Sequence, residues 1–330
     1  MDDLLAEARH QPPLPSVPVA SYPISFPLPG WAAKCGMEIG IGQDTLRLGG
    51  FALRATRQQA EFVAKCELTE RLLALRDVHE LVAGPAAGHF PVSARWTVAG
   101  PAPDPALMIP AEDVFLDDAT SVGLGFGHTA HQAVDHAIGE ALERALIGAV
   151  WYTGRVRFRQ VSDHTDTAGV RTRVLGLAAV PLAVVITTTA EVPGVFVGAA
   201  VRDRFTSAVT SATWESALLL ADARHGHDGR LQSNATHDRV VRIRTGEAQA
   251  ETEQVLADRI EPGGVAVAPA TFAEQIPVAL RLLGPDAELL VTPLLDTEGV
   301  HLVRASLRGA PTLSDLRALH AHEIPHDPIA

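Results

Sequence analysis

Residues 132–144 of this chain, QAVDHAIGEALER, repeat a pattern already present at residues 59–71, QAEFVAKCELTER. The two segments share the spacing Q-A-x3-A-x2-E-x2-E-R and lie 73 residues apart. An α-helix turns by about 100° per residue, so Glu, Glu and Arg at this spacing form one polar ridge above the alanines. The repeat therefore predicts two related helices, each with an acidic ridge.

Large apolar residues lie on the other side of each predicted helix. They are Phe62, Cys66 and Leu73 in the first copy and Ile138, Leu142 and Leu146 in the second. We expect each helix to bury this face and to present its acids on the opposite one.

Two such ridges could face each other. They would then gather four carboxylates, Glu67, Glu70, Glu140 and Glu143, and two guanidinium groups, Arg71 and Arg144. These charges repel one another and are hard to desolvate unless a cation and an anion lie between them. Magnesium with a phosphate ester fits that description.

The composition is that of a globular protein with ample apolar residues. The chain has 330 residues, 47% hydrophobic, 5% aromatic and 20% charged, with a net charge of −12. This charge argues against a nucleic-acid surface, which normally needs a basic stripe. No signal pattern and no apolar run of membrane-spanning length occurs, so we expect a cytoplasmic protein. Two cysteines, Cys35 and Cys66, cannot form a disulfide framework and indicate a reducing compartment.

The chain alternates strand-like and helical segments. Residues 1–30 end in a proline-rich stretch and are expected to form an arm, while residues 31–330 are expected to form a single domain. Residues 35–48 read as a strand or hairpin broken by Gly49-Gly50, and a helix is expected at 272–284. Further strands are expected at 92–98, 174–188, 191–200, 289–293 and 300–307. These quasi-repeated strand-turn-helix units predict a mixed α/β fold.

A third, eroded copy of the helix pattern follows at Ala208, Ala212 and Glu215. Leu218 and Leu219 replace its second acid and its arginine, so its polar ridge is gone. The glycines Gly123-x-Gly125-x-Gly127 before the second copy could cradle a phosphate or form a plain tight turn, and both readings stay open.

The segment from Ser121 to Trp151 resembles the YcaO family, with its Ser-x-Gly, glycine turn, Thr, and E-x-x-E-R. Residues 49–71 are similar to the other acidic helix of that family, residues 198–219 to its later helix, and residues 299–307 to its late strand with an arginine, here Arg304. The chain ends in a proline-containing tail, residues 324–330, similar to that of many members. The resemblance spans roughly residues 40–330.

The resemblance implies a YcaO-like fold and an enzyme that uses ATP and Mg²⁺ to phosphorylate a backbone amide of a ribosomally made precursor peptide. It implies four magnesium ligands, Glu67, Glu70, Glu140 and Glu143. It implies nucleotide contacts from Arg71, Arg144, Ser121, His128, Gln132 and Arg304. It also implies that the tail residues Pro325, His326 and Pro328 lie near the reacting groups.

The chain departs from the family pattern at several positions. Many members have Asn and Glu where this chain has His128 and Gln132, a lysine-bearing turn in place of Gly49-Gly50, and a Gln in place of Leu219. His128 could still donate to a phosphate, and Gln132 could offer its carbonyl oxygen to a metal. The same substitutions could instead mark a retired site.

Cyclodehydration to an azoline is therefore the expected activity, in natural-product biosynthesis. Thioamide or amidine formation and ATP-dependent peptide cleavage remain alternatives on the same scaffold, since they differ only in the nucleophile. A non-catalytic subunit that binds a peptide or a partner is a further alternative. We expect a precursor peptide, a leader-peptide-binding partner protein and possibly a homodimer, with no nucleic acid and no membrane.

Overall fold

The computed structural model describes residues 17–25, 28–41, 44–75, 88–102, 107–111, 114, 122–224, 249–261, 271–297 and 300–320. The chain forms two compact units. The first comprises Met1–Ile24, Pro29–Ala141 and Asp286–Gly309, and the second comprises Ser25–Leu28, Leu142–Pro285 and Ala310–Ala330. Because the boundary falls within one helix, α4 (Ala130–Gly148), the expectation of a single domain from residue 31 onward stays a prediction.

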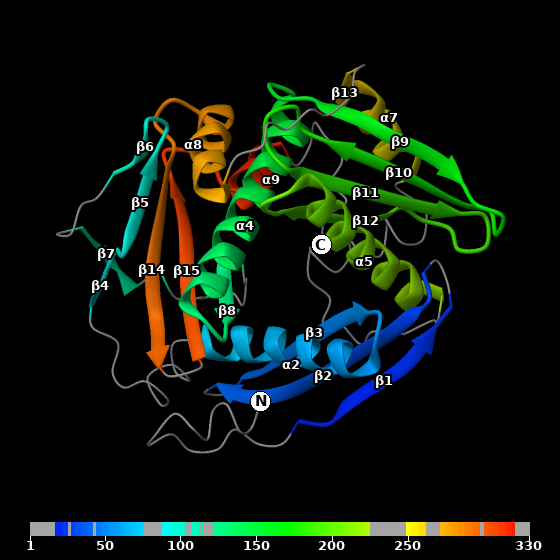
Figure 1. The fold of residues 1–330 in the computed structure, drawn as a ribbon, viewed down its shortest axis with the longest axis horizontal. Coiled ribbons are helices and arrows are strands. Elements are labelled where there is room, and N and C mark those ends of the chain that lie inside the picture. Colours follow the sequence, from blue (N-terminus) through cyan, green and yellow to red (C-terminus); the bar gives the residue numbers. More distant parts are fainter. Residues whose placement is uncertain are drawn as a thin grey trace. The chain divides into compact units, whose positions relative to one another are not determined.

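In the first unit, a helix packs on a three-stranded antiparallel sheet. The strands are β1 (Val19–Ile24), β2 (Gly30–Ile41) and β3 (Asp44–Arg54), in that order, and helix α2 (Arg57–Leu73) lies across them (Figure 1). The Thr56 side chain caps α2 by accepting from the Gln59 N–H, which supplies a partner for one of the unpaired donors of the first turn. Part of the sequence expected to form the proline-rich arm, Val19–Ile24, is therefore a strand of this sheet.

The glycine pair does not break the strand, contrary to the sequence prediction. Gly49 and Gly50 lie inside β3, and α2 crosses the strand so closely at Gly50 that only glycine fits there. A Cβ atom at Gly50 would be 1.9 Å from the carbonyl oxygen of Ala64.

The predicted buried face of α2 is confirmed at Leu73 and in part at Cys66, and is wrong at Phe62. The alanines Ala60 and Ala64 face the sheet and are fully buried, whereas Phe62 is 41% exposed. Small residues on the helix and glycine on the strand allow the two backbones to approach, so the alanine stripe is the packing face. In α4 the predicted apolar residues Ile138, Leu142 and Leu146 are buried as expected, and so are the alanines.

A second, five-stranded sheet completes the first unit. Its order is β6-β5-β14-β15-β8, with β6 at Gly100–Pro101, β5 at Ala94–Thr97, β14 at Glu288–Thr297, β15 at Val300–Arg308 and β8 at Leu124–Gly127. The expected strands at 92–98, 289–293 and 300–307 are thus confirmed. A short pair, β4 (His89–Pro91) and β7 (Met108–Pro110), lies beside it.

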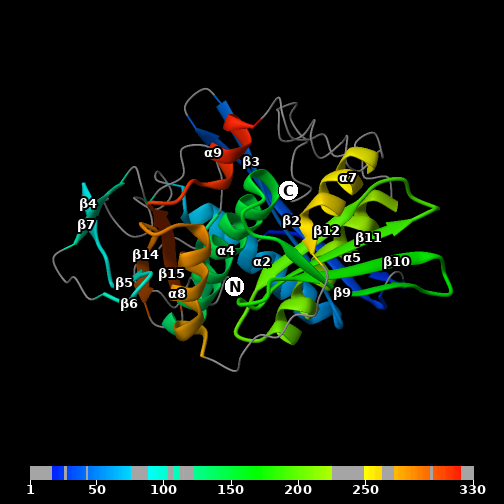
Figure 2. The same ribbon diagram turned by 90° about the horizontal axis from the view of Figure 1, so that it is seen from above.

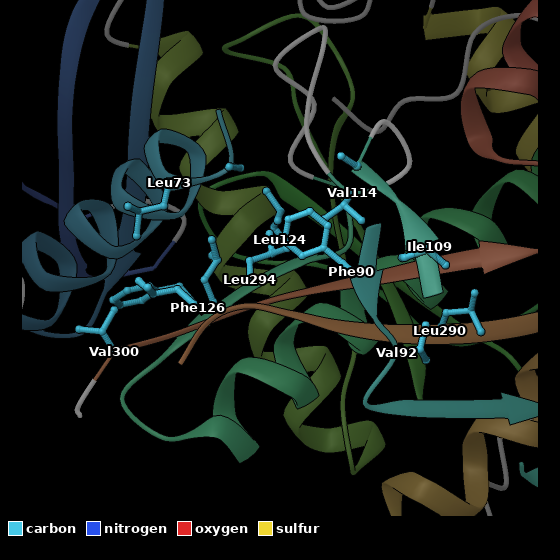
Figure 3. Close-up of a cluster of buried hydrophobic side chains, with 14 residues drawn as sticks. Leu73, Phe90, Val92, Ile109, Val114, Leu124, Phe126, Leu290, Leu294 and Val300 are labelled. Atoms are coloured by element: carbon cyan, nitrogen blue, oxygen red, sulfur yellow. The ribbon is translucent and has the colours of Figure 1, made fainter. Parts of the chain in front are cut away.

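Figure 3 shows the core of this unit. Phe90 and Ile109 of the short pair meet Leu124 and Phe126 of β8, Leu290 of β14 and other apolar side chains, together with Leu73 from the end of α2. This core joins the last turn of α2 to β8, the strand that precedes α4.

The second unit repeats the helix-on-sheet arrangement. Its sheet has the order β12-β11-β10-β9-β13, with β12 at Phe196–Val201, β11 at Leu182–Thr189, β10 at Val170–Gly176, β9 at Phe158–Thr165 and β13 at Ile260–Glu261. Helix α5 (Phe205–Arg224) lies along β11 and β12 (Figure 2). The apolar run expected as a strand at 174–188 divides into the paired strands β10 and β11.

The remaining described elements of the second unit are η2 (Ala149–Thr153), a π-helical turn that continues α4, and helices α7 (Gln249–Arg259), α8 (Phe272–Leu283) and α9 (Leu313–Leu319). The predicted helix at 272–284 is confirmed by α8, which begins with a Thr271–Glu274 capping box. Both units are mixtures of helices and sheets, as the sequence predicted. Among the helices of the described residues, none has the length and apolar character needed to cross a membrane.

Candidate functional site

Glu67, the first acid of the ridge on α2, is bonded to the neighbouring strand. The N–H of Phe51 donates to Oε2 of Glu67 at 2.7 Å, and Nη2 of Arg71 donates to the other oxygen, Oε1, at 2.6 Å. Nη1 of Arg71 also donates to the carbonyl oxygen of Gly49 at 2.8 Å. The two side chains therefore neutralise each other and hold the backbone of β3 at the same time.

The second acid, Glu70, is buried with few compensating groups. Its side chain is 6% exposed. Its Oε2 accepts from the N–H of Phe126 at 3.2 Å, and Nδ1 of His136 lies 3.7 Å from the same oxygen. Burial raises the pKa of Glu70 well above its ordinary value, and the negative charges of Glu140 and Glu67 raise it further.

The two predicted acidic ridges approach each other at Glu70 and Glu140, close enough for one charge to act on the other. His136 precedes Glu140 by one turn on α4 and so shares its face. Glu143 and Arg144 lie beyond Ala141, in the part of α4 that belongs to the second unit. There Glu143 is buried, and Nε of Arg144 lies 3.5 Å from its Oε1.

The residues that open α4 are bonded to one another. Oε1 of Gln132 accepts from the N–H of His128 at 3.2 Å, and the N–H of Gln132 donates to Oγ1 of Thr129 at 3.2 Å. The carbonyl oxygen that the sequence offered to a metal therefore stabilises the helix start. The ring of His128 stacks on Phe62 with centroids 5.3 Å apart and meets Phe126 edge-on.

The glycine-rich segment before α4 is a strand and not a free turn. Gly125 and Gly127 belong to β8, and a Cβ atom at Gly125 would be 2.0 Å from the carbonyl oxygen of Ala133. In the structure Gly125 and Gly127 form neither a tight turn nor a free loop. Both lie in β8, where the absence of a side chain lets α4 pack closely on the strand. Only Gly123, with φ +76°, has a backbone that side-chain-bearing residues rarely adopt.

The other expected site residues are distributed as follows. Arg304 lies on β15, opposite Leu124 of β8. Ser121 and the tail residues Pro325, His326 and Pro328 lie outside the described residues.

Sequence reasoning missed His136 and the backbone N–H groups of Phe51 and Phe126. His136 could have been found, since it lies one helical turn before Glu140. Backbone groups carry no residue-type signal, so only the strand–helix geometry reveals them.

The described residues could hold a divalent cation only together with additional ligands. No group of three or more His, Cys, Asp or Glu side chains among them gathers closely enough to hold a metal ion without other ligands. Mg²⁺, however, commonly takes only one or two carboxylates and completes its shell with phosphate and water oxygens. Burial and the charges of Glu140 and Glu67 disfavour the ionised form of Glu70 more than Arg71 favours it, and a bound cation would add the missing positive charge.

The likeness of this chain to known proteins lies in its fold. No protein-family model matches the sequence, and no curated protein is matched by it. Among solved structures, YcaO from Methanopyrus kandleri, bound with AMPPCP and Mg²⁺, matches 100% of this chain and 93% of its own, with 18% identity and a TM-score of 0.57.

Two further structures agree. A heterocyclase in complex with substrate and cofactor matches over 99% of this chain with 13% identity and a TM-score of 0.61, and the chain spans 56% of that protein. The E. coli microcin synthetase McbBCD complex with pro-MccB17 bound matches over 88% of this chain and 86% of its own, with 10% identity and a TM-score of 0.56. The chain therefore has the YcaO fold, as the sequence resemblance predicted.

Proposed function

We propose that this protein is an ATP- and Mg²⁺-dependent enzyme that activates a backbone amide of a ribosomally made precursor peptide. The observation that carries the proposal is the buried Glu70 carboxylate, which the charge of Glu140 reaches, within a chain that has the YcaO fold over its whole length. A YcaO protein of the same fold is bound with AMPPCP and Mg²⁺, and a heterocyclase of the same fold is in complex with a substrate.

We assign the cation to Glu70 and Glu140, with Glu143 added from the sequence repeat. When bound, Mg²⁺ would neutralise the charge of the nucleotide phosphates, which is the main requirement of phosphoryl transfer. Glu70 is held by the N–H of Phe126, which donates to one of its two oxygens. The sequence resemblance adds Arg144, Arg304, Ser121 and His128 as nucleotide contacts and the tail residues Pro325, His326 and Pro328 beside the reacting groups.

In the proposed reaction the amide oxygen of the peptide bonds to the γ-phosphorus of ATP, and ADP leaves with the electrons of the broken P–O bond. The thiol or hydroxyl of a neighbouring Cys, Ser or Thr bonds to the amide carbon. The former amide oxygen then departs as inorganic phosphate. The nucleophile and the amide nitrogen each release a proton, which leaves an azoline.

The precursor peptide is the substrate under this proposal, and a separate protein would present its leader. The microcin synthetase of the same fold is a complex, with pro-MccB17 bound to it. A sulfide, an amine or water in place of the side-chain nucleophile would give a thioamide, an amidine or cleavage on the same activated amide.

Calorimetric titration with Mg²⁺ and AMPPCP tests the proposal. We expect the wild type to bind and Glu70→Gln to lose at least about tenfold in affinity, because Gln keeps the oxygen that accepts from Phe126 but removes the charge. Glu143→Ala tests the added ligand. Glu215→Gln is the control, since Glu215 also accepts from a strand N–H, occupies in α5 the position of Glu67 and is not assigned to the metal.

Binding that is lost in Glu70→Gln and kept in Glu215→Gln would justify mass spectrometry of candidate peptides for loss of water, gain of sulfur or cleavage. A folded wild type that binds neither Mg²⁺ nor AMPPCP would contradict the proposal.

That second outcome would favour a non-catalytic subunit that binds a peptide or a partner. A specific observation supports this candidate: the Gln132 carbonyl oxygen and the Glu67 carboxylate, both expected in the site, are bonded within the protein. A pull-down of the purified protein with synthetic precursor peptides, in the absence of nucleotide, would then be the informative measurement.

A further inference from the structure

Strand β3 has an outward edge that is covered by side chains of α2. Within the described residues β3 pairs only with β2, so its other edge carries backbone groups without a strand partner. On that edge the N–H of Phe51 and the carbonyl of Gly49 point away from β2. Glu67 accepts from the first at 2.7 Å, and Arg71 donates to the second at 2.8 Å.

The Glu67–Arg71 pair reproduces the bonding of a missing strand. In a parallel sheet, one residue of a neighbouring strand donates to the carbonyl before the residue opposite it and accepts from the N–H after it. Here Gly50 is the residue between the two bonded groups, and the ion pair supplies both the donor and the acceptor. The bond between Glu67 and Arg71, 2.6 Å long, fixes the two side chains relative to each other.

The same bond to a strand occurs in the second unit, where the acidic ridge is absent. The N–H of Ala199 donates to Oε2 of Glu215 at 2.9 Å. Gly198 before it meets α5 as Gly50 meets α2, since its Cβ atom would be 2.0 Å from the carbonyl oxygen of Ala212. The following positions are Leu218 and Leu219, so this glutamate serves the strand without a second acid or an arginine.

The strand before α4 satisfies the corresponding N–H differently. Its glycine, Gly125, meets α4 at Ala133, and the residue three positions further along that helix is His136, not a glutamate. The N–H of Phe126 accordingly donates to Glu70 of α2. Of the two acids of the α2 ridge, Glu67 therefore accepts from β3, the strand on which α2 packs, and Glu70 accepts from β8.

We propose that Glu67 and Arg71 are positioning residues that clamp α2 to the edge of β3 and thereby aim Glu70, and that Glu67 is not itself a ligand of the cation. Glu67 and Glu70 are one turn apart on one face of α2, so fixing the first sets the rotation of the helix that carries the second. The clamp is inferred from the hydrogen bonds alone. Its role in aiming Glu70 at a cation rests on the proposed function.

Hydrogen exchange and metal binding, measured on the same variants, test this proposal. The first readout is amide exchange in the segments 48–54 and 196–201, followed at Phe51 and Ala199. We expect Glu67→Ala to accelerate exchange at Phe51 by at least about tenfold, because one charge-assisted hydrogen bond is lost, and to leave Ala199 unchanged. Glu215→Ala is the matched control and should do the reverse.

The second readout is the affinity for Mg²⁺ with AMPPCP in the double variant Glu67→Gln/Arg71→Leu. The carboxamide oxygen of Gln can still accept from Phe51, so this variant keeps that hydrogen bond of the clamp without the two charges. We expect protection at Phe51 to persist and the affinity to stay within about threefold of the wild type, while Glu67→Ala weakens it more.

Unchanged exchange at Phe51 in Glu67→Ala would overturn the clamp. A loss of affinity in the double variant as large as in Glu70→Gln, with Phe51 still protected, would make Glu67 a ligand and overturn the second half of the proposal. Absence of Mg²⁺ binding in the wild type would count against the proposed function, and the exchange measurement would still decide the clamp.

Discussion

The first and third strand–helix pairs of this chain share their packing and differ in their chemistry. Gly50, Ala64 and Glu67 correspond to Gly198, Ala212 and Glu215, each 148 residues further along. In both pairs the glycine admits the helix backbone, and the glutamate accepts from the N–H that follows the glycine. The residues that pack the helix are thus the ones retained.

The positions that differ are those of the candidate site. Glu70 and Arg71 of α2 correspond to Leu218 and Leu219 of α5. Glu70 is the group with the strongly raised pKa, and Arg71 completes the ion pair with Glu67. The two pairs therefore retain the residues that pack the helix on its strand and differ at the residues of the candidate site.

The largest effect is expected at the shared glycines. Gly50→Ala and Gly198→Ala would each place a Cβ atom about 2 Å from a helix carbonyl, where only backbone can give way. We expect each substitution to lower the free energy of unfolding by about 3 kcal/mol or more. Urea unfolding followed by circular dichroism measures the change.

Gly40→Ala is the control for these variants, because no atom lies within 4 Å of its added Cβ. We expect it to stay within about 0.5 kcal/mol of the wild type. If Gly198→Ala were as harmless as Gly40→Ala while Gly50→Ala unfolded the protein, the two pairs would not share their packing.

Glu70→Gln is expected to stabilise the protein at neutral pH in the absence of divalent cations, on the order of 1–2 kcal/mol. The folded-state pKa of Glu70 is raised, so the folded state holds a proton that the unfolded state has lost. Wild-type stability should therefore fall as the pH rises from the unfolded pKa, about 4.3, through the folded pKa. Gln removes this loss.

Thermal unfolding from pH 4 to pH 8 measures the effect. The two proteins should be equally stable near pH 4 and diverge as the pH rises. Glu215→Gln should show no comparable divergence, since the α5 position beside it holds Leu218. A Glu70→Gln variant less stable than the wild type at pH 7 would mean that its carboxylate is already compensated.

Much of the architecture could be predicted from the sequence, because helix periodicity and turn residues are local signals. The two repeat helices, α8 and the closing strands β14 and β15 lie where the patterns placed them. The interpretation of Gly49-Gly50 as a break was wrong, since a glycine that ends a strand and a glycine that admits a helix look identical in sequence. The exposed Phe62 reflects the same cause, because the small residues turned out to be the packing face.

The site was predictable only in part. The 73-residue repeat aligns Ala60 with Ala133. In the structure, however, the helix residue that lies against the strand glycine is Ala64 in α2 and Ala133 in α4. Helix α4 thus meets its strand one turn earlier along the helix than α2 does, and His136 replaces a glutamate at the strand N–H. A register between two elements is set by their packing and leaves no mark in the spacing of either one.

A smaller effect is expected at Ser216, which occupies in α5 the position of Leu68 in α2. Its buried hydroxyl donates to the carbonyl oxygen of Phe196 at 2.9 Å, and its Oγ lies at hydrogen-bond distance, 2.6 Å, from Oγ1 of Thr187. We expect Ser216→Ala to cost about 1 kcal/mol of unfolding free energy, since the Thr187 hydroxyl loses a buried partner.

The double variant Ser216→Ala/Thr187→Val checks this reason. The carbonyl of Phe196 loses the Ser216 donor in both variants, and the double variant also removes the Thr187 hydroxyl that the single change leaves without its partner, so the pair of changes should cost no more than the single one. Additive losses would show that the two hydroxyl groups act independently.

The smallest effect is expected from installing the missing arginine of the third pair. Leu219→Arg places a guanidinium four residues after Glu215, as Arg71 stands after Glu67, where both side chains are about one-third exposed, 31% and 29%. Such a pair contributes about 0.3–0.5 kcal/mol, and the lost apolar contact of the partly buried leucine offsets some of it.

Leu219→Gln loses the same apolar contact without gaining a charge, so the difference in unfolding free energy between the two variants isolates the ion pair. We expect Leu219→Arg to be the more stable of the two by a few tenths of a kcal/mol at low salt, and the difference to vanish near 1 M NaCl, where the Debye length is about 3 Å. A difference above about 1 kcal/mol that persisted in salt would mean that the strand edge desolvates the pair. The Glu67–Arg71 pair would then contribute to the packing of α2 as well as to its orientation, and packing and chemistry would be less separable in the first unit than the comparison of the two pairs indicates.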